Sequence, residues 1–315
     1  MRTMGRKLRV LFLVLSMVIV SSYGWGYELK WGTAPAGGLW PVIGTAMLET
    51  VTSKNPGITG NILPGPGGHN FLGIQKGSYN IAFATTDASY FAWEGKEIYE
   101  GKPLRNFRHV GTFFPHPFQW VVWADSGIKT IPDLKGKRIT YGARGSGSEL
   151  NVRKVLELYG LLDKVRFEYL SFTDAGNQMK DRQLDGLLAH FPLPHATVME
   201  LANSRPIRLL QIPEDRIQAM LAWNQGLEKF TVPPGAYKGI TEPVPGYAYH
   251  MHLIAAQDVP EDVVYRITKS IAENLPHYEK VSKAMAGIKV KDMGRKNKIP
   301  FHPGALKYYQ EVKVQ

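Results

Sequence analysis

The sequence predicts an α/β protein built from two lobes that close on each other as a clamp. The first third of the chain repeats a strand, a polar or glycine-rich loop and a helix three times, which is typical of a parallel α/β layer. A second series of the same kind follows two hydrophobic strands at 107–113 and 118–124. A late strand at 248–256 is predicted to pair with 118–124. Binding sites favour the interface between such lobes, which close around a ligand by hinge motion.

The first series consists of short strands that are each followed by small or polar residues. These strands are predicted at 28–33, 58–63 and 81–84. Pro41 fits the start of a helix that runs to residue 53, because the missing N–H of proline costs nothing there. Asp87 follows the third strand and is predicted as the N-cap of the next helix.

The second series opens with a strand at 138–142, a loop rich in glycine and serine, and a helix that begins near Ser148. Ser146 and Glu149 have the spacing of a capping box. Free N–H groups at such a helix start suit a carboxylate or a phosphate. The local sequence is equally consistent with a tight turn that binds nothing. Further strands are predicted at 166–171, 184–189 and 207–212, and further helices at 173–182 and 194–203.

The last part of the chain predicts two more helices. One runs from Pro260 to Leu275 and carries an apolar stripe that includes Val264, Ile267 and Ile271. The other covers residues 303–310.

The N-terminal segment 1–26 is predicted to be a secretory signal that directs the protein to the periplasm. Four basic residues precede an apolar run at 10–20, which as a helix spans roughly 16 Å, about half of a ~30 Å hydrocarbon core. Ser22-Tyr23-Gly24 then offers a small-x-small pattern for cleavage near residues 24–26. An uncleaved anchor is the alternative.

Composition argues against a nucleic-acid partner and against disulfides. The formal net charge is +11, and without the signal, which holds four basic and no acidic residues, 34 basic residues face 27 acidic ones, or +7. A basic run at 289–298 contains no aromatic residues for stacking on bases, so no nucleic acid is expected there. The chain has no cysteine, which for an exported protein fits a bacterial cell envelope.

The sequence offers no pattern for a metal, a cofactor or a reaction. His250 and His252 share a strand face but lack a third ligand, so no metal is expected. The glycine-rich stretch 65–70 matches neither a phosphate loop nor a dinucleotide fingerprint, so no cofactor is expected. Ser146 or Ser148 would need a positioned base to act as a nucleophile, and the sequence shows none. A binding protein is therefore expected, with an exported serine hydrolase as the alternative from another class.

Several residues in the small-residue loops are predicted to bind an organic anion. Arg144 suits a bidentate contact with a carboxylate, or is simply an exposed arginine. Trp40 is predicted to form a pocket wall or to cap the core, and His69 and Asn70 are placed at the rim of the cleft. The full set of predicted ligand-binding residues is Gly38, Leu39, Trp40, His69, Asn70, Thr85, Thr86, Asp87, Arg144, Ser146, Gly147 and Ser148.

Taken in order, these motifs resemble the TAXI-type solute receptors of TRAP transporters over about residues 29–309. The resemblance is carried by Gly37-Gly38-Leu39-Trp40, by Asp125–Thr130 followed by Asp133–Arg138, by Gly145–Glu149, by Pro260–Tyr265 and by His302–Ala305 with Tyr308-Tyr309. The chain departs from the family pattern where ligand contacts are expected. Trp40 replaces the usual tyrosine, a serine is lost at Gly67, Thr85-Thr86 replaces Gln-Ser, and Arg144 stands where proline is common.

The resemblance implies a type II periplasmic-binding fold, two α/β lobes joined by hinge strands with a ligand cleft between them. Lobe I is expected to contain residues 27–121 and 252–315, and lobe II residues 122–251. It further implies a monomeric receptor that hands an amino acid or 2-oxo acid, of the glutamate or 2-oxoglutarate class, to a TRAP permease driven by an ion gradient. Service to an ABC importer or a sensor system is the alternative.

Overall fold

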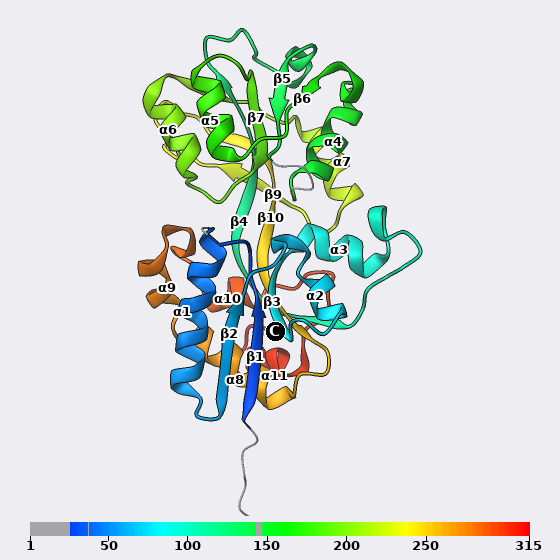
Figure 1. The fold of residues 1–315 in the computed structure, drawn as a ribbon, viewed down its shortest axis with the longest axis vertical. Helices are drawn as coiled ribbons and strands as arrows, with labels where there is room; N and C mark the ends of the chain where they lie inside the picture. Colours follow the sequence, from blue (N-terminus) through cyan, green and yellow to red (C-terminus); the bar gives the residue numbers. More distant parts are fainter. Residues whose placement is uncertain (1–25, 37, 143–146) are drawn as a thin grey trace, which may run out of the picture.

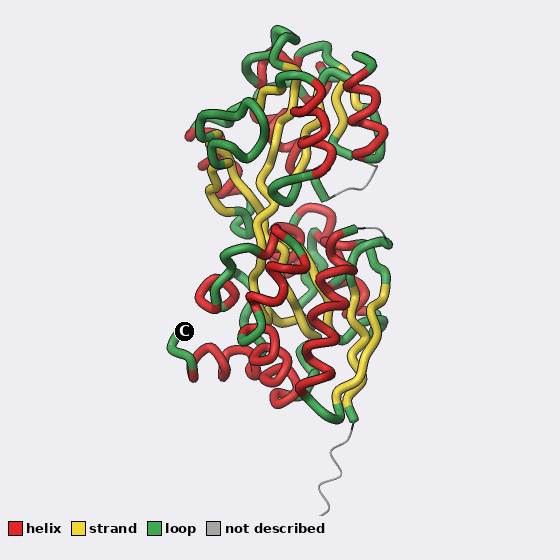
Figure 2. Tube along the Cα trace, turned by 90° about the vertical axis from the view of Figure 1, so that its left-hand side faces the viewer, coloured by secondary structure: helices red, strands yellow, loops and turns green. Residues whose placement is uncertain are grey.

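The computed structural model describes residues 26–36, 38–142 and 147–315, which form two α/β lobes placed end to end (Figure 1). Figure 2 shows the same two lobes from the side, with helices packed around the strands of each. This arrangement confirms the predicted fold class. The predicted signal lies outside the described residues apart from Gly26. Within the described part of the chain, no helix combines the length and the apolar character needed to span a membrane.

Lobe I contains a sheet in which three parallel strands stand beside the two longest strands of the protein, in the order β2-β1-β3-β10-β4. The parallel strands are β1 (Tyr27–Gly32), β2 (Ile58–Leu63) and β3 (Ile81–Thr85). The helices around this sheet are α1 (Leu39–Lys54), α2 (Phe71–Gln75), α3 (Thr86–Glu94), α8 (Glu261–Ala272), α9 (Leu275–Val281), α10 (Val290–Met293) and α11 (Pro303–Glu311).

Lobe II repeats the plan with shorter strands. Its strands are β5 (Arg138–Thr140), β6 (Arg166–Phe167), β7 (Gly186–His190), β8 (Ile207–Leu209) and β9 (Glu228–Val232). Its helices are α4 (Glu149–Leu158), α5 (Phe172–Lys180), α6 (Ala196–Ser204) and α7 (Glu214–Trp223). The helix α7 and the strand β9 were not predicted, although Ile217 and Met220 give α7 a buried face one turn apart.

Two long antiparallel strands run from one lobe into the other: β4 (Phe107–Trp123) and β10 (Val244–Ala256). The prediction of two separate strands at 107–113 and 118–124 was wrong, because the backbone stays extended between them. The prediction that 248–256 pairs with 118–124 was also wrong. The β10 residues 248–256 pair with 107–117, since 118–123 pairs with β7 and β8 of lobe II.

The long strand β4 exchanges β10 for β7 between Pro117 and Phe118, a few residues before the predicted lobe boundary at 122. The exact division between the lobes stays a prediction.

The core of lobe I includes the stripe predicted in the last part of the chain. Val264, Ile267 and Ile271 of α8 are fully buried or nearly so. Leu275 does not end this helix but begins α9, because Pro276 lacks the N–H that a continuous helix needs and instead fits the start of a new one.

Candidate functional site

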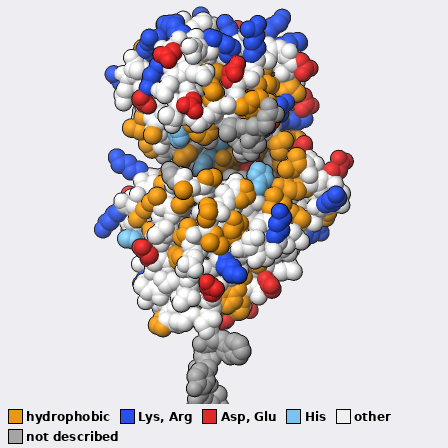
Figure 3. All heavy atoms as spheres, viewed as in Figure 1, with side chains coloured by type: hydrophobic (Ala, Val, Ile, Leu, Met, Phe, Trp, Pro, Cys, Tyr) orange, Lys and Arg blue, Asp and Glu red, His pale blue; other side chains and the backbone are white. Residues whose placement is uncertain are grey.

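A cleft of about 600 Å³ lies between the two lobes. Figure 3 shows the surface hollowed there, with histidine and hydrophobic side chains around the hollow. Lobe I contributes Ala34, Gly38, Leu39, Trp40, Gly67, Gly68, Thr85 and Ser282 to its lining. The crossing strands contribute His116 and Tyr249, and lobe II contributes Gly147, Pro192, Pro194, His195 and Ala196.

Five of the residues predicted from sequence line this cleft. They are Gly38, Leu39, Trp40, Thr85 and Gly147. Arg144 and Ser146 lie outside the described residues. His69, Asn70, Thr86, Asp87 and Ser148 are described but do not belong to the lining. That any of these residues contacts a ligand stays a prediction.

Two helices, one from each lobe, begin at the cleft. The 16-residue helix α1 follows Gly38, which has no side chain to cap it. The 10-residue helix α4 follows Ser148, whose side chain makes no capping bond among the described residues, and Gly147 lies directly before it. Because the first N–H groups of a helix have no partner within the helix, both ends present donors and a positive dipole near the cleft.

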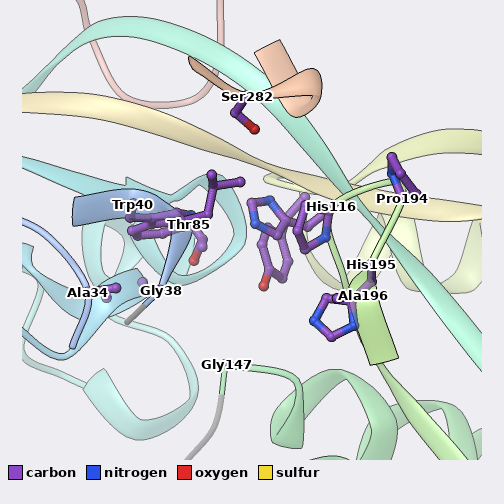
Figure 4. Close-up of a pocket in the computed structure, with 15 residues that line it drawn as sticks. Ala34, Gly38, Trp40, Thr85, His116, Gly147, Pro194, His195, Ala196 and Ser282 are labelled. Carbon is purple, nitrogen blue, oxygen red and sulfur yellow. The ribbon is translucent and has the colours of Figure 1, made fainter. Parts of the chain in front are cut away.

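Trp40 combines the two roles that its sequence position suggested. Its side chain is 8% exposed and meets the Phe83 ring edge-on, with 6.1 Å between ring centroids, so it belongs to the lobe I core. The same ring lines the cleft and stands 5.9 Å from His116 at an angle of 74° (Figure 4).

Asn70 holds the loops of lobe I together from inside. Its side-chain amide donates to the backbone oxygens of Thr33 at 2.7 Å and Phe83 at 2.8 Å, and the residue is fully buried. The prediction that Asn70 stands at the rim was therefore wrong, because these two buried carbonyls need donors and Asn70 supplies them. Gly68 backs onto Thr85 so closely that a Cβ would stand 2.9 Å from its hydroxyl oxygen.

His69 lies outside the cleft lining. Its ring packs against Phe71 with 5.8 Å between centroids, and burial lowers its pKa although Asp87 acts in the opposite direction. His69 is half-buried and directly follows Gly67 and Gly68, which line the cleft, so its rim position stays a prediction.

Thr86 and Asp87 join the lobes in what we call the polar seam, formed with Asn151, Asn224 and Gly226. The Asn151 amide donates to the Asp87 carboxyl at 2.9 Å, and the Asn224 amide donates to the Asp87 backbone oxygen at 3.1 Å. The Thr86 hydroxyl donates to the Gly226 backbone oxygen at 2.7 Å.

The predicted N-cap role of Asp87 was wrong, since Thr85 occupies that position and Asp87 lies in the first turn of α3. The side chain of Asp87 reaches across to lobe II instead, and its burial raises the pKa of the carboxyl while hydrogen bonds partly offset that rise.

Ser148 is buried, and its hydroxyl accepts a hydrogen bond from the backbone N–H of His190 at 2.9 Å. The nearby His190 ring is bonded through Nδ1 to the backbone oxygen of His116 at 2.8 Å. Among the described residues, no imidazole or carboxylate is bonded to the Ser148 hydroxyl. The arrangement supplies no base for Ser148 and therefore does not favour the hydrolase alternative.

The histidines of the cleft were missed by the sequence analysis. His116 stacks on Tyr249 with 5.0 Å between centroids and 28° between planes, and burial holds its pKa well below the usual range. Burial also lowers the pKa of His195 to about 4 and that of His190 to about 3. The only local feature that the two lining histidines share is a preceding proline, Pro115 and Pro194, which does not by itself indicate a cleft.

The two histidines considered for a metal, His250 and His252, have separate surroundings. His252 bonds Ser89 at 2.8 Å and His109 at 3.2 Å in the lobe I core, whereas His250 borders a crevice behind the crossing strands. The strand register shifts between them. No group of three metal-ligating side chains occurs in the part of the chain that the structure describes.

Two α/β lobes, two crossing strands and a ligand-sized cleft define a periplasmic solute-binding protein fold. The chain superposes on the periplasmic aliphatic sulphonate binding protein SsuA from Escherichia coli with a TM-score of 0.52 and 17% identity, covering 90% of this chain and 83% of that one. It superposes on a TctC solute binding protein from Polaromonas with a TM-score of 0.53 and 15% identity, covering 92% and 98% of the two chains.

A third similar structure is a putative L-cystine ABC transporter protein from Listeria monocytogenes, with a TM-score of 0.50 and 12% identity over 86% of this chain and 99% of that one. At these identities the likeness establishes the fold. The chain belongs to the NMT1-like family, whose model matches residues 31–312. The family and these similar structures are those of substrate-binding proteins rather than of enzymes.

Proposed function

We propose that the protein is an extracytoplasmic solute receptor that binds a small organic anion, of the amino acid or 2-oxo acid class. The observation that carries this proposal is that α1 of lobe I and α4 of lobe II begin at one cleft, where Gly38 and Gly147 leave the backbone accessible. Backbone N–H groups at two helix starts favour negative charge between the lobes. A carboxylate held there would contact both lobes and favour their closure.

The predicted ligand-binding residues then divide into two groups. Gly38, Leu39, Trp40, Thr85 and Gly147 line the cleft and are proposed as direct contacts, together with Arg144 and Ser146 from the sequence. The remaining predicted residues, namely His69, Asn70, Thr86, Asp87 and Ser148, are proposed to support these contacts from behind.

The delivery partner is proposed to be a TRAP-type permease in the inner membrane. The protein is proposed to meet it in the periplasm, to which the signal at 1–26 would direct its export. The resemblance to TAXI-type receptors supports this proposal, and the chain is proposed to act as a monomer. An ABC importer is the second candidate, because one similar structure is named as an ABC transporter protein. TRAP permease genes beside the coding gene would support the first partner, and an ATPase gene there would favour the second.

A thermal-shift screen of the exported protein against amino acids, 2-oxo acids and aromatic acids tests the receptor proposal. A ligand that binds only the folded state stabilises it by about 2.7 kcal/mol at a hundredfold excess over Kd, so the melting temperature rises. No rise with any carboxylate would contradict the anion proposal.

Arg144→Ala is expected to weaken binding of the hit about tenfold or more, as the loss of a charge-assisted hydrogen bond does. Arg166→Ala, at an exposed arginine of lobe II, is the matched control. Equal affinities of the two variants would remove Arg144 from the site.

A further inference from the structure

Given the receptor function proposed above, the aromatic residues that line the cleft restrict which organic anions fit it. Trp40 of lobe I, His116 and Tyr249 of the crossing strands and His195 of lobe II all line it (Figure 4). The His116 ring lies nearly parallel to Tyr249 at 5.0 Å and meets Trp40 edge-on at 5.9 Å. Trp40, His116 and Tyr249 are only 8%, 5% and 7% exposed, so each offers the cleft a small part of its ring, against which a further planar ring would extend the aromatic cluster.

Two nitrogen atoms of this lining have no hydrogen-bond partner. His116 is 5% exposed, and its Nδ1 is buried without a partner among the described residues. The His195 ring lies against the Phe191 ring with 4.3 Å between centroids, and its Nδ1 atom is likewise buried without a partner among the described residues. Buried polar atoms are rarely left unpaired, and a neutral imidazole can donate from one nitrogen and accept at the other. Both nitrogens are also closed off from the cleft, so an imidazole would have to turn before either could meet a ligand.

The lining offers nothing that would neutralise an ammonium group. No aspartate or glutamate is among its described residues, and the neighbouring stretch 143–146, which reads Ala-Arg-Gly-Ser, contains none. Asp87 lies behind Thr85 with its carboxyl engaged by Asn151 of the polar seam. An amino group taken from water into this cleft would lose hydration without gaining a carboxylate, which costs affinity.

We infer that the ligand is a planar, ring-bearing organic acid without an amino group. The ring packs against the parts of Trp40, His116 and Tyr249 that border the cleft. The acid group lies toward the helix starts at Gly38 and Gly147.

Isothermal titration of the exported protein with four compounds separates the two features of this inference. Phenylpyruvate and L-phenylalanine share a ring and differ in the amino group, and 2-oxoglutarate and L-glutamate repeat that difference without a ring. Phenylpyruvate is expected to bind about tenfold more tightly than each of the other three, which corresponds to one or two aromatic contacts.

Binding of L-phenylalanine or of 2-oxoglutarate as tight as that of phenylpyruvate would overturn the inference. If none of the four binds while another carboxylate gives a hit in the thermal-shift screen, the inference fails and the receptor proposal stands. If the screen also gives no hit, both fail.

Trp40→Leu tests the ring contact within the protein. It is expected to weaken phenylpyruvate binding about tenfold and to leave 2-oxoglutarate binding nearly unchanged, because only the ring loses its partner. Trp93→Leu is the matched control in lobe I, since Trp93 packs on Phe107 and lies outside the cleft lining.

The ratio of the two dissociation constants is read for each variant, so that a general loss of stability does not imitate the effect. If Trp40→Leu does not fold, Trp40→Phe, which keeps a ring, is expected to retain most of the preference for phenylpyruvate. An equal ratio in the Trp40 and Trp93 variants, or a lost preference in Trp40→Phe, would overturn the inference.

Discussion

The floor of the cleft and the polar seam lie side by side between the lobes and differ in whether their side chains are bonded across the lobes. In the seam, the Asp87 carboxyl and the Thr86 hydroxyl are bonded to residues of lobe II. On the cleft floor, His116 and His195 each keep a buried ring nitrogen without a partner among the described residues. The hydrogen bonds of the seam therefore join lobe I to lobe II, although one carboxyl oxygen of Asp87 and the amide oxygen of Asn151 are also unpaired among the described residues. The two ring nitrogens of the floor make no such bond between the lobes.

The two regions also differ in how burial acts on charge. Burial lowers the pKa of the floor histidines, which keeps them neutral near pH 7, and it raises the pKa of the seam carboxyl. The contributions of the floor histidines and of the Asp87 carboxyl to the free energy of unfolding therefore change with pH in opposite directions. The pH dependence of stability is the first test of the difference between the two regions.

Acidification is expected to have the largest effect. The pKa of His190 is about 3 and that of His195 about 4, whereas both take up a proton near pH 6.5 in the unfolded chain. The unfolded state thus binds more protons below pH 6.5, and the free energy of unfolding falls as the pH drops. At pH 5 each of the two is expected to cost about 2 kcal/mol relative to neutral pH.

Urea unfolding between pH 7 and pH 5 measures this loss. His190→Gln is expected to reduce the pH dependence, and His277→Gln, at an exposed histidine, serves as the control. A free energy of unfolding that does not change over this range would contradict the burial of neutral imidazoles at His195 on the floor and at His190 outside the lining. Asp87 acts in the other direction: its contribution is present below the ordinary value of 3.8 and is lost as the pH rises through the raised pKa of the folded state.

Gly226→Ala is expected to have the next largest effect, because the added methyl group would clash with lobe I at the seam. A Cβ at Gly226 would stand 2.2 Å from the backbone oxygen of Thr86, which cannot rotate away. The expected loss is about 3 kcal/mol, at the upper end for overpacking. Gly246→Ala is the control, since a Cβ there meets nothing nearer than 3.9 Å. Equal unfolding midpoints for the two variants in urea would show that the lobes do not pack closely at Gly226.

Asp87→Ala removes the polar partner from the seam without adding bulk. It leaves the buried Asn151 amide without its acceptor, which is expected to cost about 2 kcal/mol. Asp87→Asn keeps an oxygen that can accept from Asn151 and is expected to cost less. Chemical denaturation of both variants at pH 7 distinguishes them, and a larger loss for Asp87→Asn would mean that the negative charge itself matters.

Glu228→Gln is expected to have the smallest effect, although Glu228 also links the lobes. Its ion pair with Arg295 lies behind the crossing strands, with the two side chains 41% and 42% exposed. Water and salt screen such a pair, so the expected change is below about 1 kcal/mol and shrinks further at high salt. A loss comparable to that of Asp87→Ala, measured by the same denaturation, would place this ion pair on a par with the seam.

The parts of the fold that local chemistry determines were predictable from sequence. The strand 58–63 was predicted with its observed ends, because its flanking glycine and proline residues terminate it. Strand pairing was less predictable. Nothing local in the sequence around Pro115 and Pro117 indicates that β4 continues through them, because that depends on which neighbour each half meets.

The same distinction applies to the site. Glycine-rich helix starts such as Gly38 and Gly147 can be recognised in the sequence, because the loop and the helix that form them are neighbours along the chain. Polar loop residues did not reveal whether they face a cleft or a buried carbonyl, and Asn70 and Asp87 turned out to be structural. His116 and Tyr249 were missed because alternate residues of a long strand look alike until it is known where the lobes meet.

The two prolines that flank His116 have a mechanical consequence. Pro115 and Pro117 pair with His250 and Ala248 of β10 where the strands pass between the lobes, and neither has an N–H to donate to the ladder. The connecting ribbon therefore has two residues in this short stretch that cannot donate a hydrogen bond. His116 lies between them and also lines the cleft, so an occupant of the cleft would touch the ribbon where two of its residues cannot strengthen the ladder.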